Sequence, residues 1–366
     1  MGWTDILSPM THRPDHDQSI EPTWRLPGEF EKQSALLVAW PHRETDWASR
    51  LSEVRDEFSA LIGATLKYQP VILLRDPEDA DRLPEEIANH PSLVEIRIPF
   101  DDTWCRDFGP VGLVSDATLY LIDFEFSAWG KDYNNTKDNE VTAELAAAPE
   151  FRSLVGPIEV HPSSFVLEGG AIESNGQGTV LVNWHCLETR HPNMDRSQLS
   201  SELKSQLCAQ EIIGIDITPH AGDDTDGHID TLVRLIDEQT LVVQGLSDES
   251  MHQQLMAQVA LLEVLGQDGQ HHRPQIIVLP AAKHASDLPL NYVNFVLINH
   301  ACLVPVYDLT TDAEALAILS EALPDRDIVP IASNELITQF GGPHCATMHL
   351  PAIQANTPQP ATERPA

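Results

Sequence analysis

The chain has 366 residues, of which 42% are hydrophobic, and its 22 basic and 56 acidic residues give a formal net charge of -34. This length and composition allow a large buried core. The excess of acid disfavours a nucleic-acid partner, because phosphate binding needs clustered cations. An acidic field would raise the local concentration of a cationic small molecule, although acidity also serves solubility.

Neither a membrane span nor an export signal is predicted. No run approaches the roughly 20 apolar residues that cross a bilayer, and residues 1–18 lack the basic start and apolar core of a secretory signal. The five cysteines, Cys105, Cys186, Cys208, Cys302 and Cys345, are scattered and form no CxxC pair. This spacing disfavours a disulfide framework or a structural zinc site. We therefore expect a cytoplasmic protein in which one thiol is available for catalysis.

The elements of the chain follow an α/β pattern. Residues 1–24 predict a loose N-terminal arm, and the Pro/Thr/Ala-rich residues 352–366 predict a disordered tail. Apolar runs predict strands at 34–40, 70–75, 118–126, 178–184, 231–237, 240–245, 274–280 and 294–307. Helical spacing predicts helices at 50–68, 251–266 and 311–323, the last opened by a cap at Thr311 and Asp312. Because no low-complexity linker interrupts the alternation, we expect a single domain over 25–351.

Reactive residues and glycines concentrate in five segments. These are WCRDFGP (104–110), LEGGAIE (167–173), DDTDGHID (223–230), NYVNF (291–295) and FGGPHC (340–345). Most of them lie beside a predicted strand, where α/β folds place their active sites.

Cys345 follows Gly341, Gly342, Pro343 and His344. Glycines let the backbone approach a ligand closely and adopt positive φ, which suits an attacking thiol. The alternative is a small buried hydrophobe in a turn.

His228 and Asp230 would point to the same face of an extended segment, so that a base and a carboxylate share one cavity. One alternative is a loop histidine with acidic neighbours. A second is a hard-cation site built from Asp223, Asp224, Asp226 and Asp230, but the spacing is not that of an EF-hand loop, and we predict no metal.

Glu168 ends an apolar stretch before two glycines and would orient an imidazole, as the third member of a Cys–His–acid arrangement. The alternative is a strand-end glutamate before a turn. Trp104 and Asp107 offer a stacking face and an anion for a planar cation. The alternative for Asp107 is a surface pair with Arg106, which would be worth little.

In their order along the chain, these segments resemble the agmatine deiminase and bacterial peptidylarginine deiminase family of guanidine-modifying enzymes. The similarity runs through LPGEFEKQSALLVAWPH (26–42), DDTWCRDFGP (101–110), FEFSAWGKDYNNTKDN (124–139), FVLEGGAIESNGQGTVLVN (165–183), GDDTDGHIDTLVRL (222–235), LPLNYVNF (288–295) and FGGPHCATMHLP (340–351). The resemblance implies a five-bladed, pseudo-symmetric α/β propeller in one domain, with a central site that needs no metal or organic cofactor.

The resemblance also implies the catalytic roles. Cys345 would be the nucleophile, His228 the general acid and base, and Glu168 the partner that orients His228. Thiolate attack would expel ammonia and leave a covalent amidino-thioester, which water then hydrolyses. A thiol beside carboxylates should have a raised pKa, and we expect the bound cation to offset this effect.

The substrate-binding roles follow in the same way. Asp107 and Asp230 would hold the guanidinium, whose planar donors match carboxylates, and Trp104 would pack beside the substrate. Asp224 would help to bind the far amine. These residues predict hydrolysis of agmatine to N-carbamoylputrescine and ammonia, which would place the chain in polyamine metabolism.

Three segments depart from the family pattern: GGPHCATMHLP, with Pro343 and Met348, GKDYNNTKDN and NWHCLETRHPN. They shape the pocket for the substrate tail, so arginine, free or peptide-linked and giving citrulline, is the alternative substrate. Asp224 and the general acidity favour agmatine, which has no carboxylate.

Other classes fit less well. A noncatalytic guanidine- or polyamine-binding protein would not need Cys345, His228 and Glu168 together. A Cys–His–acid protease would not need a second pair of acids, and an amidino transferase would need an amine acceptor in place of water. Assembly into a homo-oligomer is left open.

Overall fold

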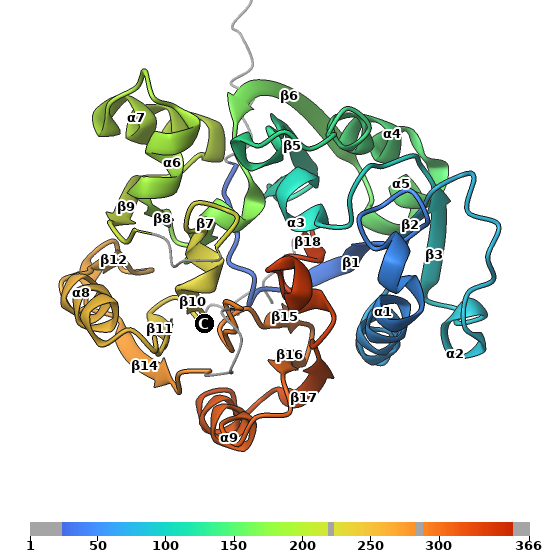
Figure 1. Cartoon of the computed structure of the whole chain (residues 1–366). Coiled ribbons are helices and arrows are strands. Elements are labelled where there is room, and N and C mark those ends of the chain that lie inside the picture. Colours follow the sequence, from blue (N-terminus) through green and yellow to red (C-terminus); the bar gives the residue numbers. More distant parts are fainter. Residues whose placement is uncertain (1–23, 219–222, 283–287, 354–366) are drawn as a thin grey trace, which may run out of the picture.

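The computed structural model describes residues 24–218, 223–282 and 288–353. The strands within these residues form five sheets of three or four strands and one two-stranded sheet. Each of the five larger sheets combines an antiparallel pair with at least one parallel pair. Figure 1 shows these sheets arranged around the centre of the molecule, with the longer helices outside.

The five larger sheets repeat one pattern of strands. In the order of their hydrogen-bonded neighbours they are β18 (Thr347–Pro351), β1 (Gln33–Ala39), β2 (Val71–Arg75) and β3 (Leu93–Arg97); β4 (Val111–Val114), β5 (Leu119–Glu125) and β6 (Ile158–Val166); β7 (Ile172–Ser174), β8 (Thr179–Asn183) and β9 (Glu211–Ile215); β10 (Val233–Leu235), β11 (Thr240–Gln244) and β14 (Gln275–Leu279); and β15 (Val296–Ile298), β16 (Ala301–Val306) and β17 (Asp327–Ala332). The two-stranded sheet pairs β12 (Val264–Leu265) with β13 (His271–His272).

Along the sequence, most helices of the described residues come between the last two strands of a sheet. They are α1 (Leu51–Thr65), α2 (Glu85–Ala88), α3 (Cys105–Phe108), α4 (Val141–Ala147), α5 (Pro149–Val155), α6 (Trp184–Arg190), α7 (Arg196–Leu207), α8 (Glu249–Val259) and α9 (Asp312–Ala322). The helical spacing predicted for α1 is confirmed, because Val54, Phe58, Leu61 and Ile62 are all fully buried. The apolar middle strands β1, β8 and β16 are likewise buried almost throughout, as expected for strands covered on both faces.

Three predicted elements need correction. The run 294–307 forms two antiparallel strands, β15 and β16, because the chain turns at His300, which has φ +64°. The helix predicted over 251–266 ends at Val259, and Val264 and Leu265 belong to strand β12. Thr311 makes no side-chain cap for α9. The carboxylate of Asp312 instead accepts hydrogen bonds from the backbone nitrogens of the preceding loop.

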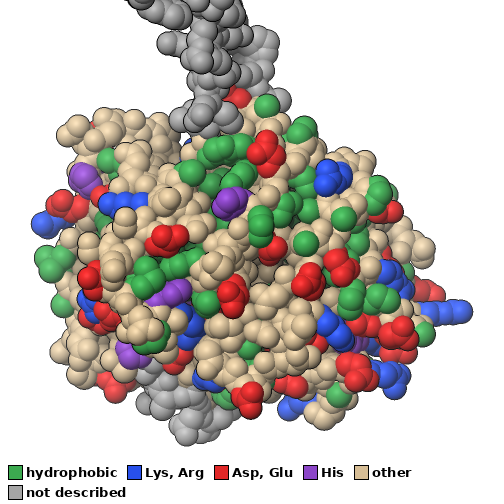
Figure 2. Space-filling model, turned by 90° about the horizontal axis from the view of Figure 1, so that it is seen from above, with side chains coloured by type: hydrophobic (Ala, Val, Ile, Leu, Met, Phe, Trp, Pro, Cys, Tyr) green, Lys and Arg blue, Asp and Glu red, His purple; other side chains and the backbone are tan. Residues whose placement is uncertain are grey.

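The outer regions carry less information about function. The predicted arm and tail lie almost entirely outside the described residues. No helix in the described ranges is long and apolar enough to cross a membrane. On the face seen in Figure 2, acidic side chains are interspersed with basic ones and do not gather into one patch.

Three short helical turns bring the chemically notable segments together. Helix α3 contacts the turn Gly169–Ala171, and that turn contacts a second one, Ile229–Thr231. Helix α3 also contacts strand β18, which directly follows the loop that carries Cys345. Segments that are far apart in the sequence therefore meet at one place.

Candidate active site

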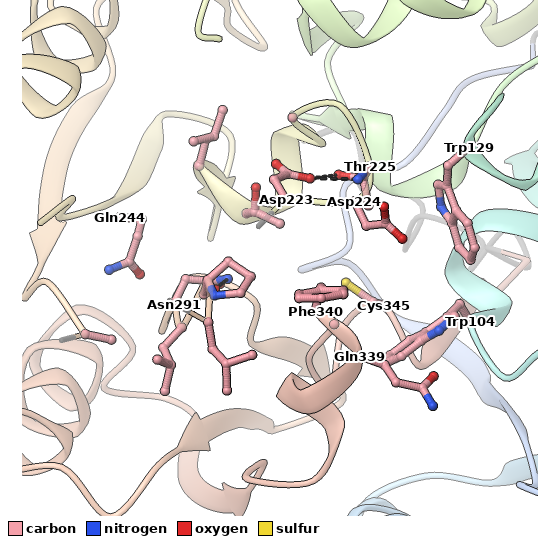
Figure 3. A pocket seen from close by; sticks show the side chains of 18 of the residues that line it. Trp104, Trp129, Asp223, Asp224, Thr225, Gln244, Asn291, Gln339, Phe340 and Cys345 are labelled. Atoms are coloured by element: carbon pink, nitrogen blue, oxygen red, sulfur yellow. Dashed lines mark hydrogen bonds between the residues drawn. The ribbon is translucent and has the colours of Figure 1, made fainter. Parts of the chain in front are cut away.

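Four of the residues predicted for the site line a single cavity of about 410 Å³: Trp104, Asp107, Asp224 and Cys345. Figure 3 shows Cys345, Trp104 and Trp129 at one side of this cavity, with Asp224 near them. The cavity wall also contains apolar side chains such as Leu232 and Met251. The combination of an apolar wall with a few polar groups is typical of a small-molecule site.

Gly170 shows how closely three of the predicted residues converge. A Cβ atom at Gly170 would lie 2.6 Å from Nδ1 of His228, 2.9 Å from Oδ1 of Asp107 and 3.2 Å from Oδ2 of Asp230. The backbone nitrogen of Gly170 also donates a hydrogen bond to Oδ1 of Asp107 over 3.1 Å. The glycine is therefore needed for space, because any side chain would push these groups apart.

His228 lies between two carboxylates at 3.7 Å. Its Nδ1 faces Oδ1 of Asp107 and its Nε2 faces Oε2 of Glu168. At this distance the contacts are ion pairs and not hydrogen bonds, and both buried ring nitrogens lack a hydrogen-bond partner among the described residues. Burial alone would lower the pKa of His228, but Asp107, Cys186 and Glu168 raise this pKa well above its usual value. The ring is therefore held protonated and ready to donate.

The expected extended geometry of His228 and Asp230 is wrong in detail. His228 is extended, with φ -54° and ψ 141°, but Asp230 lies within the helical turn Ile229–Thr231. The two side chains nevertheless meet at Gly170. They come together because of this turn and not because of strand alternation.

Glu168 is fully buried and has a cationic partner that the sequence did not reveal. Nε of Arg190 donates to its Oε1 over 2.7 Å. Arg190 also pairs with Asp226 over 2.6 Å and donates to the backbone oxygen of Thr225. Burial would raise the pKa of Glu168, but His228 and Arg190 lower it below its usual value. Arg190 thus joins Glu168 to the loop that carries His228.

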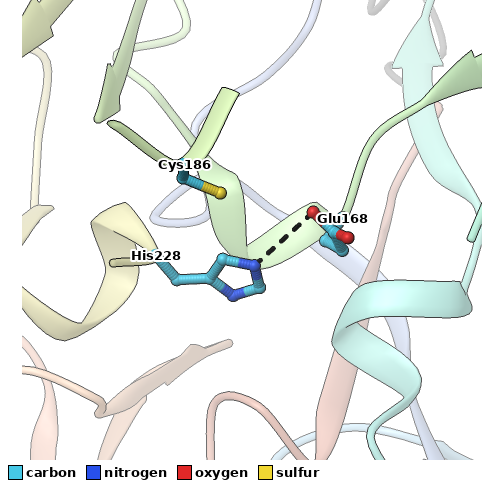
Figure 4. A group of neighbouring side chains, drawn as sticks. All are labelled: Glu168, Cys186 and His228. Atoms are coloured by element: carbon cyan, nitrogen blue, oxygen red, sulfur yellow. Dashed lines mark ion pairs between the residues drawn. The ribbon is translucent and has the colours of Figure 1, made fainter. Parts of the chain in front are cut away.

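Glu168, Cys186 and His228 form the group of potential metal ligands shown in Figure 4. All three are buried, and their ligand atoms lie within 4.8 Å of one another. A carboxylate, a thiol and an imidazole at this spacing suit a transition metal. However, Arg190 already binds Glu168, and its positive charge disfavours a cation there.

The acidic run 223–230 does not converge on one point. Its carboxylates take different partners: Asp223 binds Thr225, Asp224 binds Lys131 and Tyr133, Asp226 binds Arg190, and Asp230 binds His344. A hard-cation site needs several of these oxygens around one ion, and the geometry does not provide it.

Asp107 is a buried residue of the site, so the alternative of a surface pair with Arg106 is wrong. Asp107 is 4% exposed, and its Oδ2 accepts a hydrogen bond from Nε1 of Trp129 over 2.9 Å. Trp129 itself has φ +56°, a conformation that costs a non-glycine residue energy and often marks a functional site. Burial raises the pKa of Asp107, and Asp230 and Glu168 add to the effect.

Cys345 is 8% exposed and lines the cavity. Burial raises the pKa of its thiol well above the usual value, and the charges of Asp230 and Asp107 contribute. This confirms the raised pKa predicted for a thiol among carboxylates. Asn294 opposes the effect, because its amide nitrogen donates to Sγ over 3.2 Å.

The two glycines before Cys345 serve close packing. A Cβ at Gly341 would lie 2.4 Å from the ring of Trp104, and one at Gly342 would lie 2.5 Å from Oδ1 of Asn294. Neither glycine has the positive φ that the sequence suggested. The left-handed residue of this loop is Phe340, with φ +67°.

The residue predicted to bind the far amine, Asp224, already has partners. Nζ of Lys131 donates to its Oδ1, and the hydroxyl of Tyr133 donates to its Oδ2 over 3.2 Å. The pair is about one-third exposed, at 34% for Lys131 and 32% for Asp224. Asp224 therefore lines the cavity as half of an ion pair.

Four residues of the site had no predicted role: Trp129, Arg190, Asn294 and His344. A signal existed for two of them, because Asn294 lies in the segment NYVNF and His344 precedes the predicted nucleophile. Arg190 lies in NWHCLETRHPN, which departs from the family pattern, and Trp129 lies in FEFSAWGKDYNNTKDN, which carries the resemblance, but neither residue had a predicted role there. Their contacts depend on the tertiary fold.

Comparisons with known proteins show the family of the chain. The model of the Porphyromonas-type peptidyl-arginine deiminase family matches residues 25–351. A Vibrio parahaemolyticus protein with a provisional agmatine deiminase assignment is 31% identical over 354 residues, covering 89% of this chain and 96% of the relative. The agmatine deiminase of Stutzerimonas stutzeri is 27% identical, covering 89% and 95%. A solved structure of a cysteine-to-serine variant of C. jejuni agmatine deiminase with bound substrate is similar at a TM-score of 0.79 and 28% identity, covering 92% of this chain and 98% of that chain.

Proposed function

The chain belongs to the Porphyromonas-type peptidyl-arginine deiminase family, and we propose that it hydrolyses the guanidinium group of agmatine to N-carbamoylputrescine and ammonia. One observation carries this proposal: a thiol, an imidazole and three carboxylates are buried close together around Gly170 and beside the cavity. The names of the relatives from Stutzerimonas stutzeri and C. jejuni support agmatine as the substrate.

Substrate binding depends on Asp107 and Asp230. A guanidinium carries donors in planar forks that match carboxylates. Oδ1 of Asp230 is buried and lacks a hydrogen-bond partner among the described residues, so it is available to a bound cation. Trp104 lines the same cavity and offers its ring face to the planar group. Binding places the guanidinium carbon near Sγ of Cys345, which lies 3.8 Å from Oδ2 of Asp230.

The positive charge of the substrate activates the nucleophile. In the free site, burial and the charges of Asp230 and Asp107 keep the Cys345 thiol neutral by raising its pKa. A guanidinium between the two carboxylates cancels their charge and favours the thiolate. The thiol proton leaves to water, and the thiolate attacks the guanidinium carbon to form a neutral tetrahedral adduct.

His228 then transfers protons in both half-reactions. Its imidazolium donates a proton to the departing amino group, ammonia leaves, and the amidino carbon stays bonded to sulfur. The neutral imidazole next takes a proton from the water that attacks this carbon. The new hydroxyl gives its proton to the departing sulfur, which restores the thiol and releases the urea-type product. Glu168 stabilises the imidazolium from 3.7 Å.

The far end of the substrate lies toward Asp224. This carboxylate suits the ammonium of agmatine, which competes with Lys131 for it. Lys131 also favours a second candidate substrate, because its ammonium, which pairs with the cavity-lining Asp224, suits the carboxylate of arginine. Agmatine stays the first candidate because, in the described part of the chain, the cavity lining contains five carboxylates, Asp46, Asp102, Asp107, Asp223 and Asp224, and no Lys or Arg side chain.

We also propose that the five larger sheets are the blades of an α/β propeller. Support comes from their shared pattern, in which an antiparallel pair is followed by a parallel pair. The proposed domain is 25–351, the same range that the family model matches. In this arrangement the site collects residues from several blades.

The test is ammonia release from agmatine and from arginine, measured side by side, with Cys345→Ala as control. We expect release from agmatine that disappears in Cys345→Ala, while the far-ultraviolet circular dichroism of the variant stays unchanged. Residual activity of a few per cent in Cys345→Ala would refute the nucleophile. Release from arginine alone would replace agmatine by the second candidate.

A further inference from the structure

His344, the residue before the nucleophile, lies between two buried carboxylates. Its Nδ1 is 2.6 Å from Oδ2 of Asp230, and its Nε2 is 2.8 Å from Oε2 of Glu29. The three residues are exposed by no more than 5%. A neutral imidazole has one N–H and donates to one acceptor, whereas an imidazolium donates to two. The geometry therefore fits an imidazolium between two carboxylates.

The rest of the environment keeps Glu29 ionised. Glu29 accepts hydrogen bonds from Nη2 of Arg106 over 3.0 Å and from the backbone nitrogen of Leu297 over 2.8 Å. Nη2 of Arg234 lies 2.9 Å from Oε1 of Glu29. Burial would raise the pKa of Glu29, but Arg234, His344 and Arg106 hold it well below its usual value. Glu29 is thus a fixed anion that binds Nε2 of His344.

At its other end, His344 determines how Asp230 is presented. Oδ2 of Asp230 receives both His344 and the amide nitrogen of Asn294, the latter over 3.3 Å. Oδ1 is left without a hydrogen-bond partner in the described part of the chain, although it is buried. Burial would raise the pKa of Asp230, but His344 lowers it below its usual value. The carboxylate is therefore held ionised, with one oxygen occupied and the other free.

We propose that Glu29 and His344 form a positioning relay, which fixes the Asp230 carboxylate and directs its Oδ1 to the guanidinium of the substrate. The relay also places one positive charge among the acids that surround the nucleophile. This inference rests on the proposed function, because it assigns the purpose of the relay to guanidinium binding. His344 and Glu29 are positioning residues, since they act on the substrate through Asp230.

His349 provides a matched control within the same network. Its Nδ1 lies 3.5 Å from Oε2 of Glu29 and 3.1 Å from Nη1 of Arg106. Among the described residues, no hydrogen bond joins His349 to Asp230. Burial lowers the pKa of His349 to about 3, so this ring is neutral. A substitution at His349 therefore disturbs Glu29 without releasing Asp230.

The experiment compares His344→Gln with His349→Gln. Glutamine retains a hydrogen-bonding amide, but it carries no positive charge and cannot donate to Asp230 and Glu29 in the way that an imidazolium does. Agmatine binding is measured by calorimetry in the Cys345→Ala background, and kcat and KM are measured over a range of pH with Cys345 present. For His344→Gln we expect the dissociation constant and KM to rise by roughly 10- to 150-fold, the range for a hydrogen bond to a charged group. The acidic limb of kcat/KM should move to higher pH, because Asp230 loses the cation that lowers its pKa.

His349→Gln should change neither the dissociation constant nor the acidic limb by more than a small factor. An unchanged dissociation constant in His344→Gln, or equal losses in both variants, would overturn the relay. If the unchanged enzyme releases no ammonia from agmatine, the proposed function fails. The relay is then tested only by the protonation of the two ring nitrogens of His344.

Neutron diffraction from crystals of the unchanged chain locates the protons on the His344 ring without any substitution. It therefore tests the relay even if His344→Gln does not fold. Protons on both ring nitrogens of His344 would support the relay. A proton on only one nitrogen would overturn it.

Discussion

Asn294 donates its side-chain amide to Sγ of Cys345 over 3.2 Å, and its amide oxygen accepts a hydrogen bond from the backbone nitrogen of Cys345 over 3.3 Å. The thiol is otherwise buried among carboxylates that raise its pKa. A hydrogen bond to the charged form of a group favours that form. Asn294 is thus a neighbour that stabilises the thiolate and also fixes the loop that carries it.

We predict that Asn294→Asp slows the reaction strongly, because it replaces the donor to sulfur by another negative charge of the same shape. The loss in kcat/KM should be about 10- to 100-fold, as expected for a hydrogen bond to a charged group. The measurement is the rate of Cys345 alkylation by iodoacetamide across pH, with Cys345→Ala defining the background of the other thiols. The midpoint should move to higher pH in the variant. An unchanged midpoint would show that Asn294 does not act on the thiol.

Gly170→Ala should reduce activity while the fold persists. The new Cβ would lie 2.6 Å from Nδ1 of His228 and 2.9 Å from Oδ1 of Asp107, so these groups must move. A misplacement of about 1 Å among catalytic groups lowers the rate about 100-fold. The measurement is kcat/KM for agmatine together with the midpoint of thermal unfolding.

Gly63→Ala is the control for this change. Gly63 lies in helix α1, and the nearest atom to a Cβ there is 3.7 Å away, an ordinary contact. Alanine in a helix is more stable than glycine by up to about 1 kcal/mol. We expect normal activity and an equal or higher unfolding midpoint. If Gly170→Ala behaved in the same way, the convergence of His228, Asp107 and Asp230 at Gly170 would not matter for catalysis.

The parts of the structure that sequence could predict are those with local signals. The strands β1, β2 and β16 are apolar runs, and Cys345, His228 and Asp107 lie in short segments with unusual glycine and acid content. Turns without glycine or proline left no such signal. The chain turns at His300, which has a positive φ, and because neither glycine nor proline marks this turn, the sequence predicts one strand over 294–307.

The partners of the predicted residues could not be derived in the same way. Glu29 and His344 are 315 positions apart in the chain, yet their side chains lie 2.8 Å apart. Arg190, the last residue of helix α6, reaches Glu168, which precedes the turn Gly169–Ala171. Such contacts depend on how the sheets are placed around the centre, and no pattern of neighbouring letters specifies them. Sequence thus predicted the residues that we propose to carry the chemistry, but it did not predict the residues that contact them.

Arg190→Gln should destabilise the protein in a pH-dependent manner. Arg190 and Glu168 are 2% and 1% exposed in their side chains, and removal of one partner of a buried pair costs about 3–5 kcal/mol. The folded-state pKa of Glu168 is lowered, so the pair's contribution is present above the unfolded pKa of about 4.3 and is lost as pH falls through the lower, folded value. The free energy of unfolding, measured in urea at neutral and at acidic pH, should therefore differ most from that of the unchanged chain at neutral pH.

Arg196→Gln is the matched control for Arg190→Gln. Arg196 pairs with Glu188 and Asp216 at the surface, where its side chain is 43% exposed. Exposed pairs contribute at most about 1 kcal/mol, so this variant should stay close to the unchanged chain. Equal losses in the two variants, or a loss in Arg190→Gln that grows in acid, would contradict the assignment of Arg190 as the partner of ionised Glu168.

Lys131→Met separates the two candidate substrates. Lys131 pairs with Asp224, which lines the cavity. If agmatine is the substrate, removal of Lys131 frees Asp224 for the ammonium, and KM for agmatine should fall by about two- to fivefold, the factor that corresponds to an exposed ion pair. If arginine is the substrate, Lys131 binds its carboxylate, and removal of the ammonium should raise KM for arginine. We expect the first outcome.

Lys137→Met removes the same charge at a different place, because Lys137 pairs with Asp101 over 3.7 Å and its side chain is 44% exposed. It therefore controls for the change in overall field, which acts on any cationic substrate at long range. A fall in KM that is equal in both variants would indicate a general electrostatic effect and would remove the role of Asp224. A fall that is confined to Lys131→Met would assign the ammonium of agmatine to Asp224, because this substitution removes the cationic partner of that carboxylate.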